Sequence, residues 1–451
     1  MINLSNTNMK RRTFLKNAAA FSAGSLIVNP LEARYLSPND KILIAVIGCN
    51  GMGWANVRSL LKNKEVDLVA IADVDQNAIQ RRLVDYQKMR NNQPKTYSDY
   101  REMLNDPQID VVVIGSPDHW HCKMFVDAVE AGKHVYVEKP IANTIEECNI
   151  MVKAASKSNV MVQVGQWQRS GPHYRQAIDI VQSGILGNIR LVKVWAYQGW
   201  MNPMKQLPDA LPPEGVDYSF WLGPAPRRPF NPNRFHFNFR WFWDYAGGLM
   251  TDWGVHEIDI ALYAMKAIAP ISVMASGGKL AYPNDPAETP DTLQAVFQYP
   301  NFNMLWEHAT GIDLGPYQRR EGIAFIGNNG TLVLNRKGFE VLVENQALGY
   351  SEWGDPKMET IEKVDRPADV NYLDLHTQNF LEAIRTNDNK LLHTPIDSGS
   401  LAAINAQMGN IAYKTGNKLF WNQQKGQFDK NKKANKLVKA KYHNGWKVPK
   451  V

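Results

Sequence analysis

Short runs of apolar residues recur through the first third of the chain, and helix-like stretches separate them. The runs are rich in valine and isoleucine and show little polar alternation, which predicts strands buried on both faces of a parallel sheet. The alternation of strand and helix predicts a doubly wound α/β domain. The predicted strands span residues 42–47, 67–72, 111–114 and 135–137, and the predicted helices span 55–61, 78–87 and 98–104.

Length and composition agree with a folded protein of two or three domains. The chain has 451 residues, of which 44% are hydrophobic and 21% are charged. Folding domains usually hold about 100–200 residues, so one small binding module does not account for the length. This composition also excludes a disordered chain and a coiled coil.

The net charge of +7 is concentrated at the two ends of the chain. Residues 425–451 carry nine lysines and one aspartate, and residues 34–424 are slightly acidic. A slightly acidic body argues against a basic face that follows phosphates, so we do not expect a nucleic-acid partner. We expect the basic tail, 425–451, to be a solvated and partly ordered arm.

The cysteines and histidines show no metal-ligand pattern. Three scattered cysteines are too few for a disulfide framework, and buried thiols are the simplest interpretation. We therefore predict no metal. The cysteines are Cys49, Cys122 and Cys148.

The first 33 residues have the order of an export signal. A basic segment that includes Arg11, Arg12 and Lys16 precedes a weakly apolar run that is too short to span a bilayer. The segment resembles a twin-arginine signal, which directs the export of folded chains. The resemblance implies a periplasmic protein that acquires its cofactor before export. Cleavage near Ala33 and an uncleaved membrane tether both stay open.

A glycine-rich turn joins the first predicted strand to the first predicted helix. Strand, glycine turn and helix together form a phosphate-binding arrangement, because the backbone can approach a pyrophosphate at the helix N-terminus. The spacing is Gly-x-x-Gly-x-Gly and departs from the usual Gly-x-Gly-x-x-Gly. The predicted cofactor-binding residues of this turn are Gly48, Asn50, Gly51, Met52 and Gly53.

Asp73 ends the second predicted strand, twenty residues after Gly53. A carboxylate at this place accepts hydrogen bonds from the ribose hydroxyls of an adenosine and repels a 2′-phosphate. We therefore predict NAD rather than NADP. A turn residue at a strand end is the structural alternative for Asp73.

Three further motifs indicate a family. Segment 115–121 contains Ser116-Pro117 and ends at His121, segment 138–140 is Glu-Lys-Pro, and segment 247–259 contains Gly-Gly-x-x-x-Asp-x-Gly-x-His-x-x-Asp. Together with the glycine turn, these motifs resemble those of the glucose-fructose oxidoreductase and inositol dehydrogenase family (Gfo/Idh/MocA). The resemblance covers about residues 40 to 420.

The resemblance implies a two-domain α/β architecture. An N-terminal Rossmann dinucleotide-binding domain is expected at 34–165. A C-terminal α/β domain with a large open, mostly antiparallel sheet is expected at 166–424 and carries the substrate site. Open sheets of this kind commonly pair in the family, so we expect a homodimer or homotetramer.

The resemblance also implies catalytic roles. His256 would be the general acid/base, and Lys139 and Asp252 would be its hydrogen-bonding partners. If residues 252–256 form one helix, the i, i+4 spacing places Asp252 and His256 on one face. Oxidation of a secondary alcohol needs such a base, a group that stabilises the oxyanion, and a hydride acceptor. A buried polar network is the structural alternative for the three residues.

Further residues have predicted binding roles, and for several of them a structural role is an equal alternative. The aromatic segment 200–245 suits sugar stacking, with a core or an oligomer interface as the alternative. Ser116, Pro117, His121, Glu138 and Lys139 are predicted to contact the cofactor, and Trp167, Arg169, His173, Tyr174, Arg240, Trp243 and Asp259 the substrate.

Three functions remain open at this stage. The first is an exported NAD-dependent oxidoreductase acting on a secondary hydroxyl of a sugar, glycoside or polyol. The second is a redox-neutral glycosidase or lyase that works through a transient keto-sugar with tightly bound NAD(H). Relatives of the second kind carry Tyr-Pro-Thr-His where this chain has Trp-Gly-Val-His at 253–256, which favours the first. The third, a non-catalytic binding protein, fits less well because Lys139 and His256 are both present.

Overall fold

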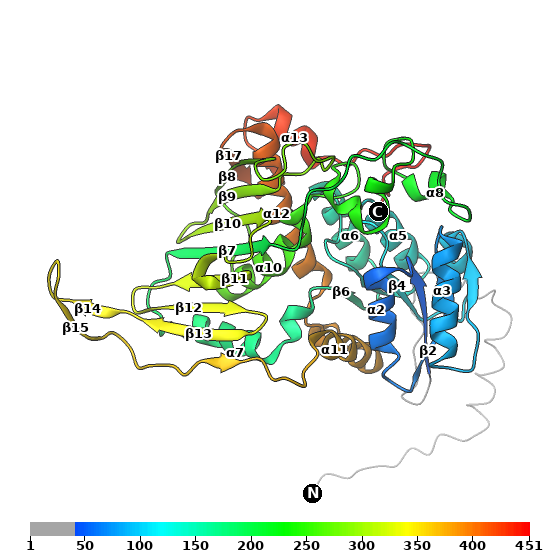
Figure 1. Ribbon diagram of the computed structural model, residues 1–451. Helices are drawn as coiled ribbons and strands as arrows, with labels where there is room; N and C mark the ends of the chain where they lie inside the picture. Colours follow the sequence, from blue (N-terminus) through cyan, green and yellow to red (C-terminus); the bar gives the residue numbers. More distant parts are fainter. Residues whose placement is uncertain (1–40) are drawn as a thin grey trace, which may run out of the picture.

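The computed structural model describes residues 41–451, so the predicted signal segment lies outside the described residues. Two α/β halves, each built on its own sheet, lie side by side (Figure 1). No helix within the described range is long and apolar enough to cross a membrane.

The first half contains a six-stranded parallel sheet in the order β3-β2-β1-β4-β5-β6. This arrangement confirms the predicted doubly wound domain, and four of its strands agree closely with the apolar runs of the sequence. The strands are β1 (Ile42–Ile47), β2 (Val66–Ala72), β3 (Lys95–Tyr97), β4 (Val111–Ile114), β5 (His134–Val137) and β6 (Val162–Val164).

Helices cover both faces of this sheet. Along β1, Ile44 and Val46 pack toward α2, α3 and α11, whereas Ala45 and Ile47 pack toward α5 and α6. Helix α11 comes from late in the chain and completes the core of the first half, which explains why the apolar runs need no polar face. The helices are α2 (Gly51–Leu60), α3 (Gln76–Gln87), α4 (Tyr100–Leu104), α5 (Asp118–Glu130), α6 (Ile145–Ser156) and α11 (Tyr372–Thr386).

The second half contains a ten-stranded sheet in the order β16-β13-β12-β11-β7-β10-β9-β8-β17-β18. All pairs are antiparallel except β7 with β10, so the predicted mostly antiparallel sheet is confirmed. The strands are β7 (Leu191–Gln198), β8 (Ser272–Gly278), β9 (Thr292–Gln298), β10 (Asn303–Thr310), β11 (Glu321–Ile326), β12 (Gly330–Asn335), β13 (Gly338–Val343), β16 (Val364–Asp365), β17 (Leu419–Asn422) and β18 (Gln427–Phe428).

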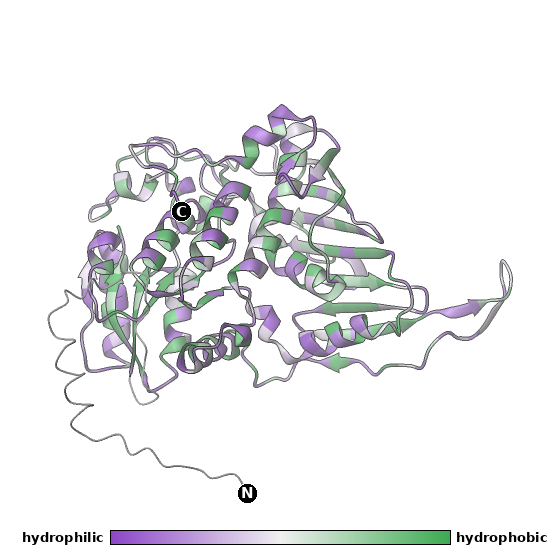
Figure 2. Ribbon diagram, turned by 180° about the vertical axis from the view of Figure 1, so that it is seen from behind, coloured by the Kyte–Doolittle hydropathy of each residue, from purple (hydrophilic) through white to green (hydrophobic). Residues whose placement is uncertain are grey.

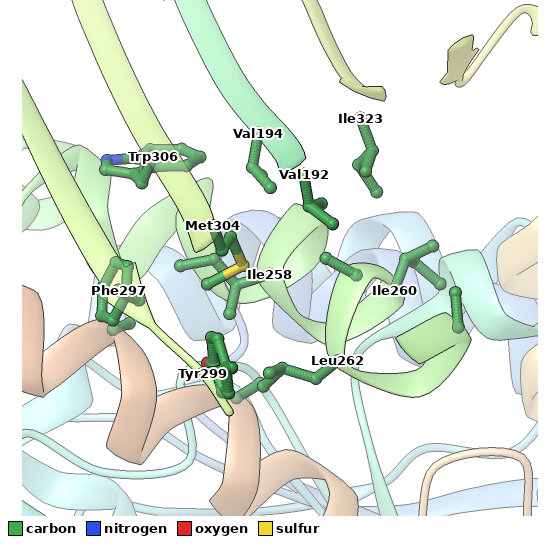
Figure 3. Packing of buried hydrophobic residues seen from close by; sticks show 14 of the residues in the cluster. Val192, Val194, Ile258, Ile260, Leu262, Phe297, Tyr299, Met304, Trp306 and Ile323 are labelled. Carbon is green, nitrogen blue, oxygen red and sulfur yellow. The ribbon is translucent and has the colours of Figure 1, made fainter. Parts of the chain in front are cut away.

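One face of the second sheet packs on helices. Val194 and Trp306 of the sheet lie against Ile258 and Ile260 of α10 in a fully buried core (Figure 3). Helix α12 contributes to the cores of both halves, which ties the two sheets together. The helices are α7 (Pro172–Ser183), α9 (Leu249–Asp252), α10 (Gly254–Met265) and α12 (Ile396–Thr415).

The other face of the second sheet is covered only in part, where Trp195 packs under Tyr317. Apolar and polar residues alternate along its strands (Figure 2), and Leu191, Met274 and Leu342 are 44–50% exposed. A hairpin formed by β14 (Asn345–Ala347) and β15 (Trp353–Pro356) extends away from the body (Figure 1). The expected pairing of copies through this face stays a prediction.

The aromatic segment 200–245 forms a small core of its own. It contains α8 (Tyr218–Leu222) and two short 3₁₀ helices, Pro232–Arg234 and His236–Trp241. Trp221 and Trp241 are each 5% exposed within this core, which agrees with the core alternative for these two indoles.

The nine lysines of the C-terminal tail are exposed, as expected of a solvated arm, but the tail is more ordered than the sequence predicts. It forms helix α13 (Lys432–Val438) and then returns to the first half of the molecule. The hydroxyl of Tyr442 donates to Glu147, and the ring of Trp446 lies 4.8 Å from that of Trp120. The lysine-rich composition of the tail did not indicate these contacts, because they come from two aromatic residues, Tyr442 and Trp446, that stand between solvated lysines.

Candidate active site

Three glycines meet where the turn after β1 crosses the end of β4. A Cβ on Gly53 would overlap the carbonyl oxygen of Gly48, and one on Gly115 would lie 2.5 Å from the Cα of Gly53. Gly48 and Gly53 therefore take the first and third positions of the usual Gly-x-Gly-x-x-Gly arrangement, and Asn50 takes the second. The apparent change of spacing comes from the additional glycine, Gly51.

Asp73 stands at the carboxyl end of β2, as the sequence predicts. Its Oδ2 accepts the backbone N–H of Cys49 at 2.9 Å, and its Oδ1 accepts that of Asp75 at 3.0 Å. Burial raises the pKa of the Asp73 carboxyl, although these two bonds act in the opposite direction. Each carboxylate oxygen keeps acceptor capacity for a ligand hydroxyl.

A cavity of about 500 Å³ lies along this edge of the first sheet. One wall comes from the strand ends of the first half, and the other comes from the aromatic segment 200–245. The hydroxyl of Ser116 is buried in this wall and has no hydrogen-bond partner among residues 41–451. A glycine cradle and a buried hydroxyl without a partner fit a dinucleotide. Predicted cofactor residues on the wall are Gly48, Asn50, Gly51, Met52, Asp73, Ser116, Pro117, His121, Glu138 and Lys139.

Glu138 and His121 hold the motif loops together. The Glu138 carboxylate accepts a hydrogen bond from Asn56 at 2.8 Å, and a Cβ on Gly165 would lie 2.7 Å from it. Burial raises the pKa of Glu138. The ring nitrogens of His121 lie 2.7 and 2.8 Å from the carbonyl oxygens of Pro140 and Ser116. Its position between these carbonyls gives His121 a structural role besides its place on the cavity wall.

Lys139 and Asp252 form an ion pair between the two halves of the molecule. The Lys139 Nζ lies 2.8 Å from the Asp252 Oδ1, and it also donates to the Asp252 backbone carbonyl at 2.8 Å. That carbonyl is available because the helix is interrupted at Trp253, between α9 and α10. Asp252 and His256 therefore do not lie on one regular helix.

Arg240 is a second cationic partner of Asp252, besides Lys139. Its Nε lies 3.1 Å from the Asp252 Oδ1. Burial raises the pKa of the Asp252 carboxyl, but Lys139 and Arg240 outweigh burial and hold it at about 2. Asp252 is thus an anion at working pH and fixes both cations beside the cavity.

His256 lies in the first turn of α10 and is 5% exposed. Burial lowers its pKa well below the usual range, and the charges of Lys139 and Arg336 lower it further. Its Nδ1 is buried and has no hydrogen-bond partner among the described residues. The imidazole is therefore neutral at pH 7, with one nitrogen able to accept a proton, as a general base requires.

Asp118 belongs to the same site, although it is not among the site residues predicted from the sequence. It begins α5, is 6% exposed and lines the cavity. Burial raises its pKa to about 7, even though Arg240 and Lys139 oppose the shift. Its carboxylate forms no ion pair within the part of the chain that the structure describes. Its place directly after Ser116-Pro117, at a strand end, was the available signal.

Most of the predicted substrate residues lie elsewhere, and only Trp167 and Arg240 border the centre. Arg169 and Asp259 form a buried bidentate ion pair with both distances at 2.7 Å. His173, Tyr174 and Trp243 contact other groups of the protein. Neither these three residues nor the Arg169–Asp259 pair line the cavity. Their contacts are His173 with the Asn335 carbonyl, the Tyr174 hydroxyl with Gln168, and Trp243 with Lys414 and the Glu288 carbonyl.

Metal ligands are not grouped anywhere in residues 41–451. No set of three or more histidine, cysteine, aspartate or glutamate side chains there is placed to hold an ion. Lys139 and Arg240 are instead paired with Asp252.

Two family models match the chain. The model described as "Oxidoreductase family, NAD-binding Rossmann fold" matches residues 42–166. The model described as "Oxidoreductase family, C-terminal alpha/beta domain" matches residues 170–340. The first match includes the glycine turn and Lys139, and the second includes Asp252 and His256.

Curated relatives match over part of their length. An alpha-N-acetylgalactosaminidase of Shewanella oneidensis is 29% identical over 204 residues, which cover 40% of this chain and 44% of that protein. The uncharacterized oxidoreductase YrbE of Bacillus subtilis is 28% identical over 246 residues, which cover 54% of this chain and 59% of that protein. The chain thus spans about half the length of the curated relatives it matches.

Solved structures share the fold over most of the chain. A levoglucosan dehydrogenase in complex with NADH and levoglucosan has a TM-score of 0.63 at 18% identity, covering 85% of this chain and 100% of that chain. The aldose-aldose oxidoreductase of Caulobacter crescentus, complexed with glycerol, has a TM-score of 0.61 at 19% identity, covering 84% and 100%. At these identities the likeness shows the fold.

Proposed function

Because the chain belongs to the Gfo/Idh/MocA oxidoreductase family, we propose that it transfers a hydride between a secondary hydroxyl of a sugar, glycoside or polyol and NAD. The observation that carries the proposal is the Lys139–Asp252 pair beside a neutral His256, at the carboxyl edge of the dinucleotide-binding sheet. Ligands of open α/β sheets bind at this edge. The geometry therefore supplies the groups that oxidation of an alcohol needs.

Each side chain has a distinct proposed task. His256 accepts the proton of the substrate hydroxyl, and Lys139 donates a hydrogen bond to the oxygen as it gains negative charge. Asp252 and Arg240 keep the Lys139 ammonium in place. Bound NAD would take up the hydride from the carbinol carbon. In a panel of sugars, glycosides and polyols, at least one compound should give reduced nicotinamide and an equal amount of keto product. The absence of both products with every compound of the panel would contradict the proposal.

Replacing Asp73 tests the choice of cofactor. In Asp73→Asn and Asp73→Ala the repulsion of a 2′-phosphate is lost, so the preference for NAD over NADP should fall by about tenfold or more. The measurement is the ratio of the Kd values for the two dinucleotides, on protein freed of its own cofactor by unfolding and refolding. Asp67→Asn, at the opposite end of the same strand, is the matched control and should keep the wild-type ratio. An unchanged ratio in both Asp73 variants would remove this residue from the ribose-binding role.

A second function, redox-neutral cleavage of a glycoside, is favoured by Asp118. Oxidation of one sugar carbon makes the hydrogen on the next carbon acidic. A base can then remove that proton, and the electron pair forms a double bond and expels the neighbouring substituent, which leaves with a proton. In a glycosidase, water would then add across this double bond, and bound reduced NAD would return the hydride to the carbonyl carbon. This sequence needs a second proton-transfer group, and a carboxyl that titrates at about pH 7 on the cavity wall provides one.

The variant Asp118→Asn separates the two functions. If Asp118 is that base, the variant should keep hydride transfer within about threefold but slow deuterium uptake from D₂O next to the carbonyl by about 10²-fold. In the wild type this uptake should rise with pH through about 7, because Asp118 acts as a base only when it is ionised. Asp127→Asn, on the same helix, is the control. Equal uptake in variant and wild type would leave the oxidoreductase as the supported function.

We further propose that the protein keeps its NAD and acts in the periplasm, where free NAD cannot be recycled. The predicted twin-arginine signal motivates the location. Retention is supported by the aromatic segment, which forms one wall of the cavity. Two backbone hydrogen bonds join this segment to the chain after β2: the N–H of Gln76 donates to the Gly215 carbonyl, and the N–H of Asp217 donates to the Val74 carbonyl. The cell fraction that contains the protein tests the location. NAD content after exhaustive dialysis tests retention, and loss of the dinucleotide would contradict it.

A further inference from the structure

A second groove, of about 730 Å³, lies on the second half of the molecule next to the candidate active site. Trp253, which directly follows the ion-paired Asp252, forms part of its wall. The remaining wall comes from the turn between β12 and β13 and from nearby loops. Six of its side chains are cationic and three are anionic, so the groove has an excess of positive charge.

Three of the cations do not pair with a carboxylate. Arg320 pairs with Asp313 at 2.8 Å, Lys363 pairs with Asp365 at 3.0 Å, and Arg319 pairs with Glu340. Arg336, Lys337 and Arg366 form no such ion pair within residues 41–451. The Nε of Arg336 is buried and has no hydrogen-bond partner there. An anion that accepts hydrogen bonds would stabilise a guanidinium that is partly removed from water and lacks a partner.

Arg336 connects the groove to the catalytic histidine. Its guanidinium lies over two indole rings, 4.3 Å from the centroid of Trp253 and 4.7 Å from that of Trp167. The ring of Trp167 is in turn 5.5 Å from the ring of His256. Trp167 thus packs between Arg336 and His256, so one indole links the wall of the groove to the proposed base.

Neighbouring elements hold the turn that carries Arg336. The hydroxyl of Tyr372 donates to the Arg336 carbonyl at 3.1 Å, and the His173 ring nitrogen lies 3.0 Å from the Asn335 carbonyl. These contacts give the buried His173 a structural role behind the groove. The turn is thus fixed before a ligand arrives, which lowers the entropy cost of binding.

Two buried carboxylates, Glu257 and Glu321, lie within electrostatic reach of Arg336 but form no ion pair with it. Burial raises the pKa of both, that of Glu257 to about 7, and the charge of Arg336 only partly opposes the shift. Glu257 therefore carries only part of its negative charge near neutral pH.

We propose that the substrate is a sugar with an anionic substituent, a carboxylate or a sulfate ester, that binds Arg336 and Lys337. The proposal rests on the proposed oxidoreductase function and names its substrate class. The planar guanidinium of Arg336 matches the two oxygens of such a group, and the exposed Lys337 adds a point charge at the rim.

Direct binding to the full-length protein tests this proposal without relying on turnover. Titration calorimetry compares methyl glucuronide and methyl glucoside 6-sulfate with neutral methyl glucoside. At least one anionic sugar should bind about tenfold or more tightly than the neutral one. Arg336→Gln should remove this difference in affinity, and Lys337→Gln should reduce it. The preference of the wild-type protein for the anionic sugar should also become smaller at high salt. Lys193→Gln, an exposed lysine on β7 outside the groove, is the control.

The possible outcomes distinguish a failure of the proposed substrate class from a failure of the proposed hydride transfer. Equal affinity for all three sugars, or an anion preference that survives Arg336→Gln, would overturn the substrate class. Arg336→Lys provides a second variant that keeps the charge, and it should recover only part of the preference because it lacks the planar fork. If an anionic sugar binds as expected but gives no reduced nicotinamide, the hydride-transfer function fails and the binding site stands.

Discussion

Replacing His256 or Lys139 by alanine should lower kcat at least about 10²-fold and leave the dinucleotide bound. Without His256, the site loses the buried, neutral imidazole that we propose as the acceptor of the hydroxyl proton. Without Lys139, it loses the ammonium that we propose to stabilise the oxyanion, and Asp252 keeps only Arg240 as a cationic partner. Both effects concern the reacting oxygen, so cofactor affinity should change little.

Matched controls for these variants lie in the same domain. Lys133 and His134 are also buried, but they stand at the amino end of β5, opposite the edge that carries Lys139. Lys133→Ala and His134→Ala should change stability without a comparable loss of turnover. Single-turnover rates and bound dinucleotide are measured for all four variants. Wild-type rates in both His256→Ala and Lys139→Ala would refute the assignment of the catalytic pair.

Gly53→Ala should destabilise the dinucleotide-binding half by about 2–3 kcal/mol or more and abolish NAD binding. The new Cβ would overlap the Gly48 carbonyl oxygen, and only backbone atoms lie close enough to move. Separation of α2 from the end of β4 would also displace the N–H groups that would hold a bound pyrophosphate.

Gly51→Ala is the matched control within the same turn. A Cβ there meets nothing within 4 Å, so only the positive φ of +47° is penalised, at about 1–2 kcal/mol. Denaturant unfolding and dinucleotide titration compare the two variants. If Gly53→Ala were as stable as Gly51→Ala and bound NAD normally, the close packing of Gly48, Gly53 and Gly115 would not be the reason for the glycine at position 53.

The architecture was predictable from the sequence because buried parallel strands leave a simple pattern. Runs such as 111–114 are apolar on both faces, and the structure covers both faces with helices. The motif loops were predictable for a related reason. They follow strand ends, and parallel strands place their carboxyl ends on one edge.

Contacts between distant segments were not predictable. Arg169 and Asp259 are typical candidates for substrate binding, yet they neutralise each other across ninety positions. Asp118 was missed because burial, which raises its pKa, depends on the aromatic segment folding over the cavity. Arg336 was missed because it is a turn residue whose position depends on the register of β12 and β13.

The central claim is that this site oxidises a sugar hydroxyl with NAD and that Lys139 and His256 are required. The most direct test uses protein purified without added cofactor. The dinucleotide is released by denaturation and identified, and the absorbance of reduced nicotinamide is followed while neutral and anionic sugars are added to the native protein. We expect NAD to be present and its reduction by at least one sugar to depend on Lys139 and His256. NAD that stays oxidised with every sugar, with no sugar product formed, would contradict the account.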